Sequence, residues 1–272
     1  MLLGLTAAVR QPKCSLTLDE LNCVNATLDD LPKTLQLAKD LKFLESDIPV
    51  LKKGDFDNFP HLTDFVCLDC NISAVRADAL WGLKNLIRVE LYGNNLTVLD
   101  MNVVTNCGKI KDFVVSWNRG LVVPENRPFL ISSTLTNLDL TGNDITQVFP
   151  VTFSRLPALK GLTLAGNLLQ RVSPEVLSGL KNLNFVDLSR NRFRVISLSA
   201  FPKRVRKVRL GWNPWFCDCS LFPVIQWSKS RDVEEDVRCF QPQRVKWKEF
   251  VISNCSSELV DAIRQRKINS DG

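Results

Sequence analysis

The residue types that could do chemistry in this chain are mainly cysteines, and two short motifs bring them close together. Cys217-Asp218-Cys219 separates two thiols by one residue, and Cys67 and Cys70 are separated by two. A close pair of this kind can be a redox couple, half of a zinc site or part of a set of disulfides. Zinc would need further Cys or His ligands, and the one histidine, His61, lies in an expected loop. The spacing alone does not choose among these interpretations.

No catalytic motif is evident in the sequence. Acid–base and triad chemistry need a histidine or carboxylate with a partner at motif spacing, and His61 has none. The sequence contains no phosphate-binding P-loop, no nucleophile elbow and no H-E-x-x-H zinc motif. Pairs such as Glu234-Glu235 are interpreted as a solvated surface. We therefore expect no enzymatic activity, no cofactor and no metal.

Composition is that of an ordinary soluble globular protein, with 45% hydrophobic and 24% charged residues. The net charge is +6, and we interpret the Lys and Arg residues as spread along the chain, which argues against nucleic acid as a partner. The first residues, MLLGLTAAVR, resemble a shortened signal peptide, and no later window predicts a membrane span. Four glycosylation sequons together with clustered cysteines favour a secreted protein; they begin at Asn25, Asn71, Asn95 and Asn254.

An internal repeat dominates the chain. Segments beginning at residues 38, 62, 86, 110, 135, 159, 183 and 205 fit the pattern L-x-x-L-x-L-x-x-N-x-L with substitutions. The alternating central leucines predict a short strand with one buried face, and stacked strands predict a parallel sheet over one continuous core. The asparagine after each strand predicts an interior ladder of hydrogen bonds. Apolar residues on each returning segment predict a second inward-facing row on the convex side.

This pattern resembles the leucine-rich repeat, in the 24-residue class typical of animal extracellular proteins. The run NPWFCDCSLFPVIQW resembles the C-terminal cysteine-rich cap of Toll-type and Slit-type ectodomains, and CSLTLDELNCVNATLDDLP is similar to their N-terminal cap. The resemblance implies an α/β solenoid, a right-handed curved horseshoe of about eight repeats with a parallel concave sheet and disulfide-stapled caps. The expected parts are a signal-peptide-like or disordered segment (1–13), an N-terminal cap (14–37), repeats (38–212), a C-terminal cap (213–256) and a polar tail (257–272).

The resemblance and the repeat register also suggest what the cysteines do. The family joins the first cysteine of the C-terminal cap to the third and the second to the fourth, and the two N-terminal cysteines imply one bridge. The implied disulfides are Cys14–Cys23, Cys217–Cys239 and Cys219–Cys255. Cys67, Cys70 and Cys107 fall on the strand-leucine, ladder and convex-leucine positions, so we expect buried free thiols.

The concave face of the sheet is where we expect a partner to bind. In the first four repeats, large apolar side chains on this face are bordered by charges, a composition typical of a protein-binding patch, although exposed apolar residues also occur singly. Trp117 is the first candidate anchor, and Phe185 with Trp212 is a second, smaller locus. The expected binding residues are Leu68, Arg88, Glu90, Tyr92, Asp112, Val114, Trp117, Phe185 and Trp212. Sugars on Asn71 and Asn95 would cover one flank and leave the concave face favoured.

The resemblance implies an extracellular recognition module that binds a protein ligand or co-receptor in adhesion, signalling or innate immunity. Two alternatives remain open at this stage. The chain could be a secreted pattern-recognition factor for a microbial surface glycan or lipid, or the targeting domain of a larger receptor or enzyme. A second copy of the chain is a further partner to consider.

Overall fold

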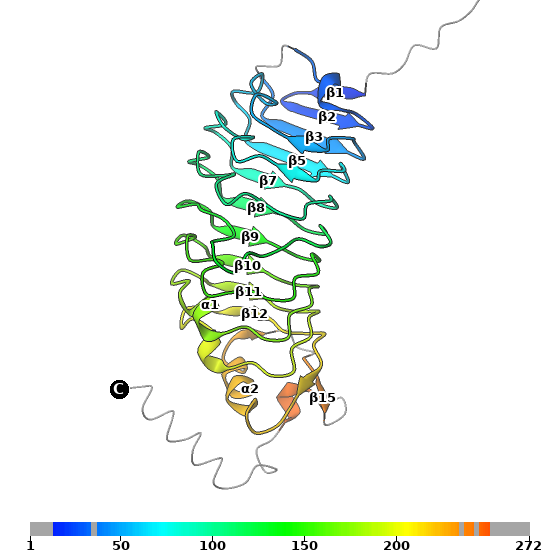
Figure 1. Cartoon of the computed structure of the whole chain (residues 1–272). Helices are drawn as coiled ribbons and strands as arrows, with labels where there is room; N and C mark the ends of the chain where they lie inside the picture. Colours follow the sequence, from blue (N-terminus) through cyan, green and yellow to red (C-terminus); the bar gives the residue numbers. More distant parts are fainter. Residues whose placement is uncertain (1–12, 34–36, 234–236, 242–244, 251–272) are drawn as a thin grey trace, which may run out of the picture.

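The computed structural model describes residues 13–33, 37–233, 237–241 and 245–250. Its main element is one 11-stranded sheet that runs the length of an elongated solenoid, in the order β1-β2-β3-β5-β7-β8-β9-β10-β11-β12-β14 (Figure 1). The strands of this sheet are β1 (Cys14–Thr17), β2 (Glu20–Val24), β3 (Asp40–Leu44), β5 (Asp64–Leu68), β7 (Arg88–Glu90), β8 (Asp112–Val114), β9 (Asn137–Asp139), β10 (Gly161–Thr163), β11 (Phe185–Asp187), β12 (Lys207–Arg209) and β14 (Asp232–Val233).

The eight strands β3, β5 and β7 to β12 are the repeat strands, and each pairs in parallel with the next. Register is constant, so that Asp40, Asp64, Arg88 and Asp112 lie side by side on successive strands. The predicted solenoid with a parallel sheet and about eight repeats is confirmed. Residues at the same position of successive repeats therefore lie next to one another and form one column on the surface of the sheet.

The convex side of the repeats contains only short elements among the described residues. Strands β4 (Val50–Leu51) and β6 (Ala74–Val75) pair in parallel there, and the helix α1 (Pro174–Ser178) has five residues. A 3-10 helix spans Leu198–Ala200 in the repeats, and another, Leu28–Asp30, lies in the N-terminal cap. The helical part of the expected α/β class is therefore small. In the part of the chain that the structure describes, no helix is both long and apolar enough to cross a bilayer.

One continuous core fills the solenoid between the sheet and the convex turns. The strand leucines supply one row, and the returning segments supply the second, with Phe56, Phe129 and Phe153 among its buried members. Neither row could bury its apolar surface in a single repeat, so stacking is what removes this surface from water.

A ladder of buried asparagines follows the strands. Their side chains form hydrogen bonds with the backbone amides and carbonyls of the bends. Asn118 is typical, since its Nδ2 donates to the carbonyls of Leu91 (2.8 Å) and Ser116 (3.0 Å) and its Oδ1 accepts from the amide of Leu96 (3.1 Å). The ladder asparagines are Asn94, Asn118, Asn143, Asn167, Asn191 and Asn213. Each one therefore joins its own repeat to the preceding one.

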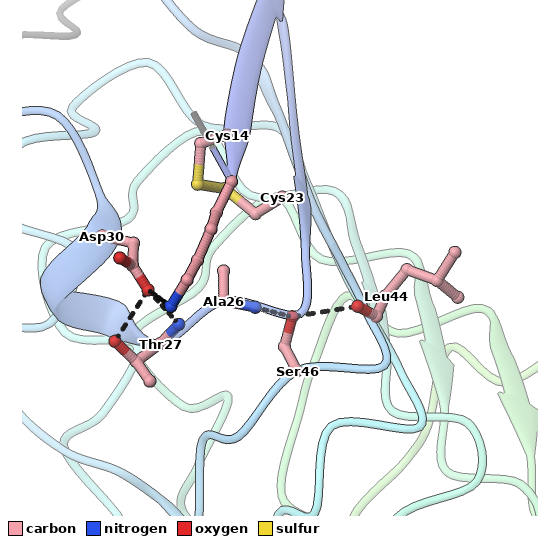
Figure 2. The surroundings of a disulfide bond; sticks show 8 residues. Cys14, Cys23, Ala26, Thr27, Asp30, Leu44 and Ser46 are labelled. Carbon is pink, nitrogen blue, oxygen red and sulfur yellow. Dashed lines mark hydrogen bonds and ion pairs between the residues drawn. A yellow bond between two sulfur atoms is a disulfide. The ribbon is translucent and has the colours of Figure 1, made fainter. Parts of the chain in front are cut away.

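The first two repeats depart from the asparagine ladder. Cys70 occupies the position in the second repeat, and its thiol donates to the carbonyls of Leu68 and Phe43 at 3.5 and 3.6 Å. Ser46 occupies it in the first repeat, where its hydroxyl donates to the Leu44 carbonyl and accepts from the Ala26 amide (Figure 2). A hydroxyl or thiol is shorter than a carboxamide and has fewer polar atoms, so the ladder is weaker at this end.

The N-terminal cap covers the first repeat strand with an antiparallel hairpin. The strand β1 pairs with β2, and a disulfide joins Cys14 to Cys23 across them (Figure 2). The Asp30 carboxylate accepts hydrogen bonds from the amide and hydroxyl of Thr27 and also pairs with Lys13 Nζ at 2.9 Å. The outer edge of the first repeat strand, β3, is thus covered by a small, locally satisfied unit.

The C-terminal cap contains the helix α2 (Phe222–Ser228), the paired strands β13 (Trp215–Phe216) and β15 (Cys239–Gln241), and a 3-10 helix at Trp247–Glu249. Trp215 is fully buried, and its indole N–H donates to the Leu210 carbonyl at 2.9 Å. A disulfide joins Cys217 to Cys239. Cys219 is also disulfide-bonded, and its expected partner, Cys255, lies outside the described residues.

Candidate ligand-binding face

One residue in every repeat adopts a left-handed backbone conformation, directly before the ladder position. Their φ angles lie between 48° and 70°. We call this set the left-handed column: Glu45, Asp69, Gly93, Trp117, Gly142, Gly166, Arg190 and Trp212. The amide of Trp117 donates to the Thr141 carbonyl of the next repeat (2.8 Å), which fixes the bend. Glycine adopts this conformation without a steric penalty, whereas a side chain makes it costly.

Trp117 is a large aromatic side chain held in this costly conformation and 45% exposed on the concave side. Its indole lies against Gly142, where an added Cβ atom would come within 2.8 Å of the indole Cδ2 atom. The ring of Tyr92, 38% exposed, lies beside it, with centroids 6.5 Å apart and planes inclined by 53°. The two rings therefore form a supported aromatic pair that is open to solvent.

Apolar side chains of the first repeats extend this pair. Leu44 and Leu68 are half-buried and precede Tyr92 in the same column, while Val66 and Val114 lie on either side of Glu90. We call this surface the aromatic patch, defined by Leu44, Val66, Leu68, Tyr92, Val114 and Trp117.

Charged side chains lie within and beside the aromatic patch, and several are held by polar partners. Arg88 and Glu90 form an ion pair, and the Asp112 carboxylate accepts a hydrogen bond from Asn137. Asp40 faces Asp64 at the start of β3 and β5. Burial, and next the negative charge of Asp64, raise the pKa of the Asp40 carboxyl, against the hydrogen bond from Thr63.

The fifth and sixth repeats present a flatter concave surface. Gly142, Ala165 and Gly166 contribute almost no side chain there. The Asp139 carboxylate accepts hydrogen bonds from the amide and the hydroxyl of Thr141, so its charge is engaged locally. This stretch separates the aromatic patch from the end of the solenoid.

Phe185 and Trp212 do not come together as one locus. Phe185 begins β11 and lies beneath Lys207 Nζ, 5.9 Å from the ring centroid. Trp212 lies beyond the other end of β12, is 77% exposed and stacks with the Arg190 guanidinium at 5.3 Å. The two rings occupy opposite edges of the sheet, because register fixes them at different positions along the strand. Each ring is instead paired with its own cation.

The interpretation that Lys and Arg are spread along the chain is wrong for the last two repeats. Residues 183–212 carry eight Lys or Arg residues and one acidic residue, Asp187, whereas residues 13–109 carry ten basic and fourteen acidic residues. The acidic excess near the N-terminal end hides this gathering in the total charge. A charge count made repeat by repeat finds the basic segment from the sequence, although our own sequence interpretation missed it.

Three of the four sequons lie in the described residues, and their asparagines are exposed. Asn95 donates to the Asn71 side chain, and Asn71 donates to Asp47 (3.0 Å), so these side chains form a row on one flank. An open hollow of about 400 Å³ lies beside this row, with Asn25 among its lining residues. Asn254 lies outside the described residues.

The three cysteines outside the caps are free and buried. Burial, and next the neighbouring Cys70, raise the pKa of the Cys67 thiol, and burial raises the pKa of Cys107 to about 11. A buried thiol that resists ionisation is a poor nucleophile and a poor metal ligand. Within the described ranges, no group of three Cys, His, Asp or Glu side chains is placed to hold a metal ion.

Comparisons with known proteins agree with this architecture. A leucine-rich repeat family model matches residues 133–193. Trophoblast glycoprotein of Macaca fascicularis is 24% identical over 86% of this chain, and human Toll-like receptor 9 is 28% identical over 72% of it. The chain spans 63% of the macaque protein's length and 21% of the receptor's.

A solved structure shows the same fold. The crystal structure of human 5T4, also called trophoblast glycoprotein, has a TM-score of 0.72 at 21% identity and covers 90% of this chain and 98% of the solved one. At this coverage, the match includes most of the repeats and of the register-stacked sheet. The chain thus contains leucine-rich repeats and has the fold of leucine-rich repeat proteins, with disulfides near both ends of the solenoid.

Proposed function

We propose that this chain is an extracellular, non-enzymatic recognition module that binds a protein ligand or co-receptor on its aromatic patch. The observation that carries the proposal is that Trp117 is exposed although its backbone is in a left-handed conformation. A bulky residue in a left-handed conformation costs about 1–2 kcal/mol relative to glycine, and the indole still remains 45% exposed. A strained and solvent-exposed aromatic residue has no evident role in folding, so a role in binding accounts for it best.

The surroundings of Trp117 support the same proposal. Tyr92 extends the apolar surface, Arg88 and Asp112 place charges at its border, and Glu90 lies between Val66 and Val114. Protein interfaces commonly have an aromatic centre with a polar rim. The disulfides and the names of the relatives, a glycoprotein and a receptor, support an extracellular setting.

Two alternatives share this extracellular setting. In one, the chain is a secreted factor that recognises a microbial glycan or lipid. In the other, it is the targeting domain of a larger receptor or enzyme, a hypothesis that is consistent with its partial coverage of the relatives. The full-length transcript would separate the second alternative from a free-standing protein.

Affinity capture from extracellular fluid, followed by purified binding measurements with the partner found, tests the proposal. We expect Trp117→Ala to weaken binding about thirtyfold, because truncating a central anchor costs about 2 kcal/mol or more. Tyr92→Ala should weaken it less. The matched control is Trp81→Ala, a tryptophan that is 57% exposed on the returning segment. Equal binding by the wild type and both patch variants would refute the assignment of the patch.

A further inference from the structure

We propose that the last two repeats carry a second binding site, for a linear sulfated glycan. The site is the basic band, defined by Arg190, Arg192, Arg194, Arg206, Lys207 and Arg209, together with the ring of Trp212. It goes beyond the proposed function, because it takes another class of ligand on another part of the solenoid. Trp117 and Trp212 are four repeats apart, which corresponds to about 19 Å at the usual strand spacing.

The band crosses the sheet from one edge to the other. Arg206 and Lys207 lie at the start of β12, and Arg209 ends this strand on the concave face. Beyond the other edge, Arg190, Arg192 and Arg194 are exposed and alternate with the buried Asn191 and Phe193. Alternation of this kind directs all three guanidinium groups away from the core, so the repeat architecture itself gathers the charges.

Within residues 13–33, 37–233, 237–241 and 245–250, acidic side chains scarcely neutralise these charges. In the described part of the chain, the one ion pair that involves the band joins Lys207 to Asp232 at 3.9 Å, near the limit of such a contact. Asp187, the acidic residue of these two repeats, accepts hydrogen bonds from the amide and hydroxyl of Ser189. Counted over the described residues, the band therefore carries an excess of positive charge, which attracts a polyanion and releases its counterions on binding.

The chemistry of the band matches sulfate groups carried on sugar rings. Five of its six cations are arginines, whose planar guanidinium groups form paired hydrogen bonds with tetrahedral oxyanions. The Trp212 indole is 77% exposed beside Arg190, so it offers an apolar platform to the C–H face of a sugar.

A single-stranded nucleic acid is the competing polyanion, and the band fits it less well. Proteins that bind single strands present successive aromatic platforms, one for each stacked base. In the described part of the chain, two exposed rings lie beside the six cations: Trp212, and Phe216, which is 43% exposed and donates its amide to the Arg194 carbonyl. Phe185 is partly covered by Lys207. A polymer that carries many charges and few flat rings matches this excess of cations over exposed aromatic rings better than a nucleic acid does. The extracellular location proposed above, where sulfated polysaccharides are abundant, favours the same choice.

Binding of the full chain to an immobilised heparin-derived oligosaccharide, measured over a range of salt concentrations, tests the proposal. The variant R190Q/R192Q/R194Q should bind at least about tenfold more weakly at physiological salt and depend less steeply on salt. The matched control K52Q/K53Q/K84Q removes the same charge from exposed lysines of the early repeats. It should bind within about twofold of the wild type if the band is the site. Trp212→Ala should weaken binding without changing the salt dependence.

Three results would overturn the proposal. The first is equal loss in the band variant and the lysine control, which would mean that total charge alone drives binding. The second is undiminished binding to a desulfated oligosaccharide of the same length. The third is tighter binding to a single-stranded oligonucleotide of matched charge than to the sulfated sugar. Every substituted residue is exposed, so we expect each variant to fold like the wild type. Thermal melting of each variant checks this.

Discussion

The asparagine ladder gives a sharp test of what holds the repeats together. Replacing Asn118 with alanine removes three hydrogen bonds inside the core. The carbonyl of Ser116 keeps a partner, since it also accepts from the amide of Gly93. The amide of Leu96 and the carbonyl of Leu91 lose the asparagine bonds in a dry environment. Each buried polar group left without a partner costs about 1–3 kcal/mol.

We therefore expect Asn118→Ala to lower the free energy of unfolding by about 4 kcal/mol, a large share of the roughly 5–15 kcal/mol of a typical domain. Cys70→Ala is the matched control, because it truncates the same ladder position in another repeat. The Cys70 thiol is a weak donor, so its bonds at 3.5 and 3.6 Å, which are ordinary distances for sulfur, contribute little. Its loss should cost about 1 kcal/mol, mostly as lost packing.

Urea unfolding, followed by circular dichroism and by tryptophan fluorescence, measures both values. Coincident transitions from the two probes would show that the repeats unfold together and that a single free energy describes them. A loss of less than 1 kcal/mol for Asn118→Ala, or the same loss for both variants, would contradict the reasoning. Either result would mean that water or backbone movement satisfies the bends without the ladder.

Three further outcomes are expected. Iodoacetamide at mildly alkaline pH should leave Cys107 unmodified until denaturant is added, because burial holds its pKa at about 11; native labelling seen by mass spectrometry would contradict this. Asp64→Asn should raise stability by a few tenths of a kcal/mol at neutral pH, since it removes the charge that faces Asp40. Because the pKa of Asp40 is raised in the folded state, ionised Asp40 destabilises the fold at a pH above this pKa. The stability gained by Asp64→Asn should therefore vanish in acid, where Asp40 is protonated. Urea unfolding at neutral and at acid pH would show this difference. Arg190→Gly should stabilise the chain by roughly 0.5–1 kcal/mol by relieving its left-handed conformation, and an unchanged or lower urea midpoint would count against that strain.

The repeat period made most of the fold predictable. Once the start of each repeat was known, the period assigned every residue to a column, and burial followed from the column. Trp215 and the ladder asparagines are buried for this reason, and the three free cysteines lie in the core as their register implied. Local sequence was less informative in the degenerate first repeat, where the ladder role of Ser46 was not recognised.

The candidate site was only partly predictable, because a period specifies columns but not backbone conformations or ring contacts. The sequence placed Trp117 on the concave side, but neither its positive φ nor its contact with Gly142 follows from the pattern. Phe185 and Trp212 were grouped by residue type, although strand positions five residues apart separate them. The basic band was missed because charges were counted over the whole chain instead of by repeat.

The left-handed column has a consequence for how this surface could change over time. Its residues contribute little to the core, so substitutions there leave the scaffold intact and alter only what is displayed. Glycine would be the more stable choice at Glu45 or Arg190, and selection for robustness alone would drive such positions toward it. A lineage that keeps bulky or charged residues in this column is retaining them against that drift. A library of variants could be selected only for thermal tolerance and then sequenced. The residues of this column that disappear from it should mark the positions that natural selection has preserved for binding.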